Sequence, residues 1–161
     1  MEDACRTLEV NLLANANMGA FLMERMKRQG HGHIVFIASI AGMYPLPNSP
    51  AYSASKQGVS YYARALAAEG KKAGVRVSCV YPGYVETPMG HRLQALQPLS
   101  VTAEDLAVVI KNKLEEGKDR IIHPYAASLA VRLLGWMPKR LADGLAEKLG
   151  YTVVPDRESK D

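Results

Sequence analysis

The 161-residue sequence has few cysteines, little excess charge and no long apolar run. Its two cysteines, Cys5 and Cys79, are far apart and match no metal-ligand spacing, which excludes a disulfide scaffold and predicts a reducing compartment. No run of about 18 uncharged apolar residues occurs, so we expect no membrane-spanning helix. The net charge of +4 is too small to indicate a nucleic-acid partner. We therefore expect a soluble, cytoplasmic protein.

The first half of the sequence alternates helical and strand patterns. Residues 4–28 carry apolar side chains near helical spacing, and an alanine-rich helix is predicted from about residue 51 to residue 72. Short apolar runs at residues 34–37 and 75–80 are typical of strands buried on both faces of a parallel sheet. The composition, 48% apolar and 22% charged, fits one globular domain.

The second half continues the alternation. Residues 102–105 resemble a capping box and predict a helix that ends near Glu116. A third strand is predicted at residues 120–123, followed by helices at about residues 126–136 and 139–149. Strands alternating with helices predict an α/β sheet with right-handed crossovers, and we see no second domain.

Tyr52 and Lys56 are four residues apart on the predicted long helix, so their side chains share one face. A free tyrosine has a pKa of about 10, and an ammonium group beside it favours the phenolate and lowers that pKa. Tyr52 would then act as a general acid/base near neutral pH. The alternative is a half-buried tyrosine beside a solvated lysine, since helices carry such pairs by chance.

Ser39 follows the first strand directly, at the carboxyl end where parallel sheets present groups to ligands. Its hydroxyl can donate a hydrogen bond to the oxygen that Tyr52 protonates and stabilise charge as it develops there. The alternative is a serine that ends the strand and bonds to the backbone.

Three segments in this order and spacing resemble the short-chain dehydrogenase/reductases (SDR): residues 34–42 (IVFIASIAG), 51–56 (AYSASK) and 81–89 (YPGYVETPM). The resemblance covers roughly residues 5–90. It implies a Rossmann-type fold and an oxidoreductase. The implied reaction is hydride transfer between a nicotinamide dinucleotide, NAD or NADP, and an alcohol or carbonyl substrate.

The resemblance also implies residue roles. Tyr52 is similar to the family's acid/base, and Lys56 to the partner that also holds the nicotinamide ribose. Ser39 resembles the residue that orients the substrate oxygen, and Asn11 the asparagine that supports a water chain to the lysine. A partly exposed asparagine without a role is the alternative for Asn11. The segment that packs on the nicotinamide and binds its carboxamide is similar to Pro82, Gly83, Val85 and Thr87.

The family opens with a strand, a glycine-rich turn and a helix that cradles the pyrophosphate, and this pattern is missing from the sequence. No G-x-G-x-x-G occurs, and the glycines at positions 30 and 32 precede a strand instead of following one. We therefore expect a partial Rossmann-type, doubly wound parallel sheet that lacks the N-terminal dinucleotide-binding βαβ half. The strand at residues 34–37 should have a bare edge. We interpret the chain as a truncated form, or one that needs a partner chain, and expect it to bind no dinucleotide tightly alone.

We predict one partial Rossmann-like domain over residues 1–161, with a catalytic segment at 1–90 and a substrate loop and C-terminal helices at 91–161. The C-terminal helices are apolar and basic. We favour a pocket cover or a dimer interface for them, with a membrane surface as the alternative. A homo-oligomer is expected. A non-catalytic interaction or dimerisation module is the alternative function, and the sequence predicts neither the substrate nor a preference between NAD and NADP.

His31 and His33 flank a glycine just before the first strand. We interpret them as members of a solvated turn, not as a metal-binding pair, and we predict no metal site.

Overall fold

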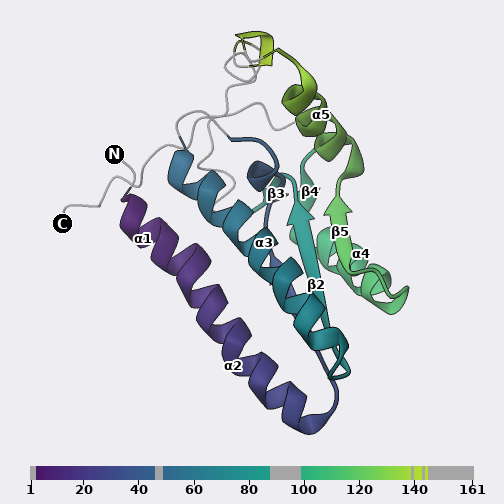
Figure 1. Ribbon diagram of the computed structural model, residues 1–161. Helices are drawn as coiled ribbons and strands as arrows, with labels where there is room; N and C mark the ends of the chain where they lie inside the picture. The colour runs from purple at the N-terminus through teal and green to yellow at the C-terminus, as the bar shows by residue number, and fades with distance from the viewer. Residues whose placement is uncertain (1–2, 46–48, 88–98, 139, 143, 145–161) are drawn as a thin grey trace, which may run out of the picture.

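The computed structural model describes residues 3–45, 49–87, 99–138, 140–142 and 144. Within these residues the chain alternates helices and strands, and helices pack on both faces of a central parallel sheet (Figure 1). The architecture is the partial Rossmann-like α/β sheet predicted from the sequence.

The first helical region runs without a break through α1 (Ala4–Leu8), η1 (Glu9–Leu13) and α2 (Ala14–Gln29). The middle segment, η1, is a π-helical turn, and the residues that flank it keep right-handed helical φ and ψ angles. Gly30 ends α2 with φ of +77°, in the left-handed region that favours glycine. The helix predicted over residues 4–28 is confirmed, but its π turn was not predicted.

Three parallel strands form the main sheet: β1 (Gly32–Ile37), β2 (Val75–Pro82) and β5 (Arg120–His123), in the spatial order β1-β2-β5. All three strands were predicted. A separate parallel pair, for which we predicted no strands, joins β3 (Val85–Glu86) to β4 (Val101–Thr102). Two-residue strands are too short to show an alternating pattern, so this pair left no signal in the sequence.

One face of the main sheet is covered by α2 and α3 (Pro50–Lys71), which lie side by side (Figure 1). The Phe36 ring on β1 meets the Tyr62 ring on α3 edge to face, with centroids 5.9 Å apart. Gly19 on α2 permits this packing, because a Cβ there would lie 2.7 Å from Cζ of Phe36. The packing of α2 and α3 on this face holds the beginning of α3 above the carboxyl end of β1.

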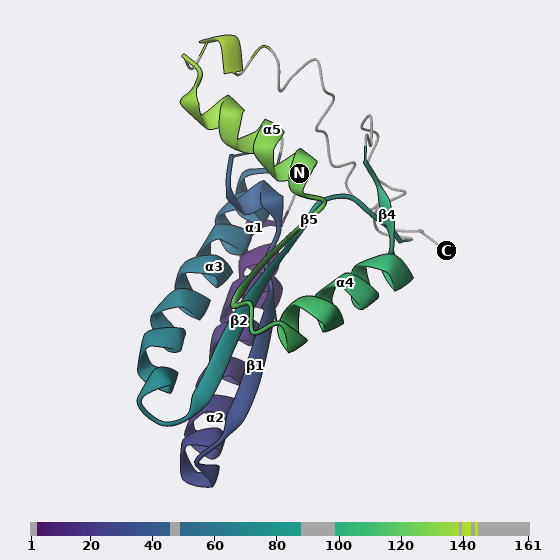
Figure 2. The same ribbon diagram turned by 90° about the vertical axis from the view of Figure 1, so that its right-hand side faces the viewer.

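The opposite face is covered by α4 (Ala103–Glu115). Val80 and Ile121 alternate along their strands with residues of the α3 side, so they face away from α3, and both are buried together with Leu106 of α4. Figure 2 shows α3 and α4 on opposite sides of the strands. The predicted cap is confirmed, because the Thr102 hydroxyl accepts the backbone N–H of Asp105 at 3.0 Å at the start of α4.

The two crossover connections have opposite hands. The connection from β1 through α3 to β2 is right-handed, as predicted (Figure 1). The connection from β2 through α4 to β5 moves in the same direction along the sheet, but α4 lies on the face opposite α3. This second connection is therefore left-handed, and our prediction was wrong (Figure 2). The handedness rule applies where a strand feeds directly into its helix, whereas residues 83–102 separate β2 from α4.

β1 forms one edge of the main sheet in the part of the chain that the structure describes, since its pairing there is with β2 alone. The outward-facing Ile37 at its end is 45% exposed. This bare edge was predicted from the sequence. It places an open side of the sheet next to the carboxyl end of β1.

His33 lies within β1 and not in a solvated turn, so that interpretation was wrong for this residue. The strand begins already at Gly32, and Nε2 of His33 lies 2.8 Å from the Ser78 hydroxyl on β2. Burial lowers the pKa of His33, and the nearby Arg76 guanidinium lowers it further. Among the described residues, no three side chains group as a metal site.

Candidate active site

Ser39 follows β1 in an extended conformation and begins the single 3₁₀ turn η2 (Ile40–Gly42). Its Oγ accepts the backbone N–H of Ala41 at 3.1 Å, and the residue is 8% exposed. The hydroxyl thus bonds to the backbone, as one interpretation of Ser39 predicts, and it also lowers the pKa of Tyr52, while its role in orienting a substrate oxygen stays a prediction.

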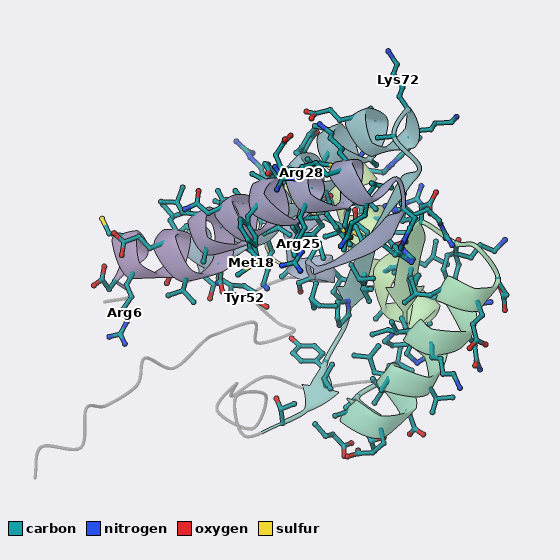
Figure 3. The ribbon with its side chains drawn as sticks, turned by 90° about the horizontal axis from the view of Figure 1, so that it is seen from below. Arg6, Met18, Arg25, Arg28, Tyr52 and Lys72 are labelled. Atoms are coloured by element: carbon teal, nitrogen blue, oxygen red, sulfur yellow. The ribbon has the colours of Figure 1, made fainter. Side chains whose placement is uncertain are left out.

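Tyr52 and Lys56 lie in the first turns of α3, which begins with Pro50 in the position that proline favours. The Lys56 Nζ lies 5.9 Å from the centroid of the Tyr52 ring, so the two side chains share a face as predicted. Figure 3 marks Tyr52 near the start of α3 and Lys72 at its end. The pair therefore lies at the end of α3 where the strands terminate.

Lys56 reaches back to the sheet. Its Nζ donates a hydrogen bond of 3.2 Å to the carbonyl oxygen of Ile37, the last residue of β1. Burial lowers the pKa of Lys56, whereas the interaction with Cys79 raises it. The contact fixes the ammonium group beside the residues that lead into Ser39.

Burial dominates the protonation of Tyr52 in the chain alone. It raises the pKa of Tyr52 above its ordinary value, and the hydrogen bond to Ser39 lowers this pKa by a smaller amount. The Lys56 ammonium group is directed at the Ile37 carbonyl, while much of the phenol is shielded from water. A pKa of Tyr52 near neutrality therefore stays a prediction for the loaded site.

Asn11 lies in the π turn η1 and faces α3. Its Nδ2 donates to the Ser55 hydroxyl at 3.3 Å, and that hydroxyl donates to the backbone carbonyl of Tyr52 at 2.7 Å. Asn15 in turn donates from its Nδ2 to the Asn11 carbonyl at 2.9 Å. Asn11 is thus linked to the turn that carries Tyr52, while its role in a water chain stays a prediction.

The sequence reasoning missed Ser55 and the π turn. Ser55 is fully buried, and it connects the first helix to α3. Its position directly before Lys56 is the one signal that could have indicated it. A π turn adds one residue to a helical turn and is frequent at functional sites, but no residue pattern predicts it.

The predicted cofactor segment leaves the end of β2 beside the Ser39 turn. Pro82 is buried, and the backbone N–H of Gly83 donates to the His123 carbonyl at 2.8 Å. A Cβ on Gly83 would lie 3.5 Å from Cδ1 of Ile40, so the two segments are in contact. The Thr87 hydroxyl donates to the carbonyl of Val85 at 3.4 Å.

The structure therefore brings Ser39, Tyr52 and Lys56 together at the carboxyl end of β1, with Asn11 linked to them through Ser55. Pro82 and Gly83 lie at the carboxyl end of β2, whereas Val85 and Thr87 lie further along the chain, in and directly after β3, and their place at the site stays a prediction. Two other predicted parts, most of the substrate loop near residues 91–100 and most of the helix at 139–149, lie outside the described residues.

Comparisons with known proteins point in one direction. Residues 1–97 match the family model described as short chain dehydrogenase. The structure of a short chain dehydrogenase from Burkholderia cenocepacia in complex with NADP superposes with a TM-score of 0.75 at 26% identity, covering 92% of this chain and 61% of that chain. The fold of 4-hydroxyisoleucine dehydrogenase complexed with NADH gives a TM-score of 0.63 at 24% identity, covering 76% of this chain and 58% of that one.

Relatives in sequence agree. An uncharacterized oxidoreductase of Myxococcus xanthus is 29% identical over 136 residues, which is 84% of this chain and 53% of the relative. The cis-4-hydroxycyclohexanecarboxylate dehydrogenase of Sinomonas cyclohexanicum is 38% identical over 84 residues, which is 52% of this chain and 34% of the relative. The chain spans about half or less of the length of these two relatives.

Proposed function

Because the chain belongs to the short-chain dehydrogenase family, we propose that it carries the proton-transfer machinery of a nicotinamide-dependent oxidoreductase acting on an alcohol or carbonyl substrate. The observation that carries this proposal is the placement of Ser39, Tyr52 and Lys56 together at the end of β1, where Ser39 lowers the pKa of Tyr52 and the Lys56 Nζ lies 5.9 Å from the centroid of the Tyr52 ring. Two neighbouring hydroxyls can both bond to one substrate oxygen.

In the reductive direction, Tyr52 gives the proton of its hydroxyl to the oxygen of the substrate carbonyl, and the same oxygen accepts a hydrogen bond from Ser39. In the oxidative direction, the Tyr52 phenolate removes the proton from the alcohol. A bound nicotinamide ring supplies or accepts the hydride. Asn11 acts as a positioning residue, since its side chain holds Ser55, whose hydroxyl bonds to the Tyr52 backbone.

The residues at the site fit the nicotinamide end of NAD or NADP. The Lys56 ammonium group has three protons and gives one to Ile37, so two remain for ribose hydroxyls. Gly83 exposes backbone without a side chain, and the Thr87 hydroxyl can both donate and accept a hydrogen bond. We propose that Tyr52, Lys56, Pro82, Gly83, Val85 and Thr87 hold this end of the cofactor.

We propose that the site binds the nicotinamide ribose, and the described residues include no glycine-rich turn for the pyrophosphate. We expect the chain to use reduced nicotinamide mononucleotide nearly as well as NADH or NADPH. The values of kcat/KM should differ by less than about tenfold, or about 1.4 kcal/mol, because the adenosine half makes few contacts. Steady-state assays with a panel of ketones and millimolar cofactor measure this ratio.

The control is a fluorescence titration with NADH and NADPH. A micromolar dissociation constant would show that this chain also binds the adenosine half of the cofactor. Binding of all three cofactors without turnover of any carbonyl or alcohol would instead contradict the enzymatic proposal.

The raised pKa of Tyr52 predicts a directional pH dependence. The phenol is the dominant form at neutral pH, so reduction, which uses the phenol as acid, should be nearly independent of pH. Oxidation uses the phenolate, so its rate should rise about tenfold per unit between about pH 6 and about pH 9. Initial rates in both directions, at saturating substrate, test this; an oxidation rate that stays constant over this range would exclude Tyr52 as the base.

A second copy of the chain is the partner we propose for the helical layer. Five apolar side chains on η1, α2 and α3 are more than half exposed: Val10, Leu13, Met18, Phe21 and Tyr61. This surface favours a homo-oligomer, and in the alternative function it would make the chain a dimerisation module without catalysis. Light scattering coupled to size exclusion tests the assembly. A dimer without turnover would support the module, and a monomer would exclude it. The cytoplasmic location stays a prediction.

A further inference from the structure

An apolar stripe on α5 (Tyr125–Trp136) faces away from the protein. It consists of Tyr125, Leu129, Leu133 and Trp136, which lie within about 80° of the helix circumference at 100° per residue. Their exposed fractions run from 45% for Leu129 to 90% for Trp136. Figure 2 shows α5 at one end of the molecule.

The other side of α5 is the one that packs on the protein. Ser128 is fully buried, and Ala127 contacts the core beneath α3. Among the described side chains, α5 therefore packs on the protein with Ala127 and Ser128 and leaves the four apolar side chains of the stripe in solvent. The pocket cover and the dimer interface, which we favoured from the sequence, stay predictions for this helix.

The charged residues of the segment 125–142 have one sign, although Arg132 also lines a cavity together with Asp119 of the neighbouring segment. Residues 125–142 contain Arg132, Lys139 and Arg140 and no aspartate or glutamate. Arg132 and Arg140 are exposed, and Arg132 lies next to the stripe on the helix surface. A second copy packed stripe to stripe would bring these cations together, which opposes a dimer through α5.

We propose that α5 docks its stripe on the surface of an anionic lipid bilayer. Large apolar side chains with surrounding cations and no acids are the composition of helices that lie in the plane of such an interface. Tyrosine and tryptophan, which occupy the two ends of the stripe, prefer the boundary between headgroups and acyl chains. The contact is peripheral: in the described part of the chain, no helix has the length and hydropathy to cross a bilayer. It is independent of the proposed hydride transfer.

Trp136 provides the measurement, because it is the only tryptophan of the chain and belongs to the stripe. Vesicles of phosphatidylcholine with about 30% phosphatidylserine should shift its emission to shorter wavelength at low salt, and molar salt should reverse most of the shift. Vesicles of phosphatidylcholine alone should give a much smaller shift. No shift with the anionic vesicles would overturn the proposal.

Two variants separate the apolar and electrostatic contributions while keeping Trp136. Leu133→Ser should weaken partitioning to anionic vesicles at least about tenfold, since Leu133 would be buried in the interface. Arg132→Gln should weaken it about fivefold. Val108→Ser is the matched control, because Val108 on α4 is 58% exposed and Leu133 57%, and it should change nothing.

The same measurements distinguish a protein partner. If Leu133→Ser bound vesicles as tightly as the parent, the stripe would not be the docking surface. If Trp136 were already shielded in a dimer without lipid and did not respond to vesicles, a second copy would be the occupant and the proposal would be wrong.

Discussion

Tyr52→Phe is expected to lower the rate of substrate turnover by about 10² to 10⁴, the range that one general acid/base contributes. The substitution keeps the ring and its packing but removes the hydroxyl that gives or takes the proton. It also leaves the Ser39 hydroxyl without its partner on α3. Single-turnover rates with the best substrate of a panel, at saturating cofactor, measure the effect.

Tyr61→Phe on the same helix is the matched control. Tyr61 is 61% exposed and lies on the surface proposed to face a second copy, but the substitution keeps its ring, so loss of the hydroxyl should leave turnover unchanged. Thermal unfolding of both variants by circular dichroism checks that the fold is retained. A Tyr52→Phe protein that folds and keeps more than about a tenth of the rate would exclude Tyr52 as the proton donor.

The second large effect is expected from Gly42→Ala, because the added methyl group would collide with the backbone of α3. A Cβ on Gly42 would lie 2.8 Å from the backbone nitrogen of Gln57 and 2.9 Å from the carbonyl carbon of Lys56. Both neighbours are backbone atoms of α3, so either the Ser39 turn or α3 must move. We expect a loss of about 1–3 kcal/mol in the free energy of unfolding. Separation of Ser39 from Tyr52 by about 1 Å should cost a further factor of about 10² in turnover.

Urea unfolding and turnover of Gly42→Ala are compared with those of Gly144→Ala. A Cβ on Gly144 meets no described atom within 4 Å, so the control adds the same methyl group into open space. Its stability should be unchanged or slightly higher, since alanine is the better helix former. Full activity and full stability of Gly42→Ala would show that the two backbones are not in contact.

The strands and the long helix could be predicted because their residues repeat with a clear period. The apolar run at residues 34–37 and the alanine-rich stretch before Lys72 identify buried elements without knowledge of the rest. The left-handed second crossover could not be predicted, because the 20 residues between β2 and α4 let the helix pack on either face, and no periodic pattern there indicates which. The short β3–β4 pair lies in the same stretch and is too short to show a period.

At the site, spacing was enough to place Tyr52 and Lys56 on one face, because four residues make about one helical turn. The pKa of Tyr52 was not predictable in this way. The direction of the pKa shift depends on the burial of Tyr52 and on the hydrogen-bond partner of Lys56. That partner is a backbone carbonyl, which sequence spacing does not reveal. Ser55 was missed for the same reason, since its two partners lie on separate helical elements.

The π turn at η1 has a consequence for how the first helix tolerates insertions and deletions. The π turn absorbs one extra residue, so the helix before it and the helix after it keep the phase of an uninterrupted α-helix that is one residue shorter. Removing a single residue from Glu9–Leu13 would let this turn relax into regular α-helix while Gly19 still faced Phe36. A deletion within Ala14–Gln29 would instead rotate the residues on its two sides by about 100° relative to each other. The first helical region should therefore accept a one-residue deletion in the π turn far better than one in α2, at the expense of the contact between Asn11 and Ser55.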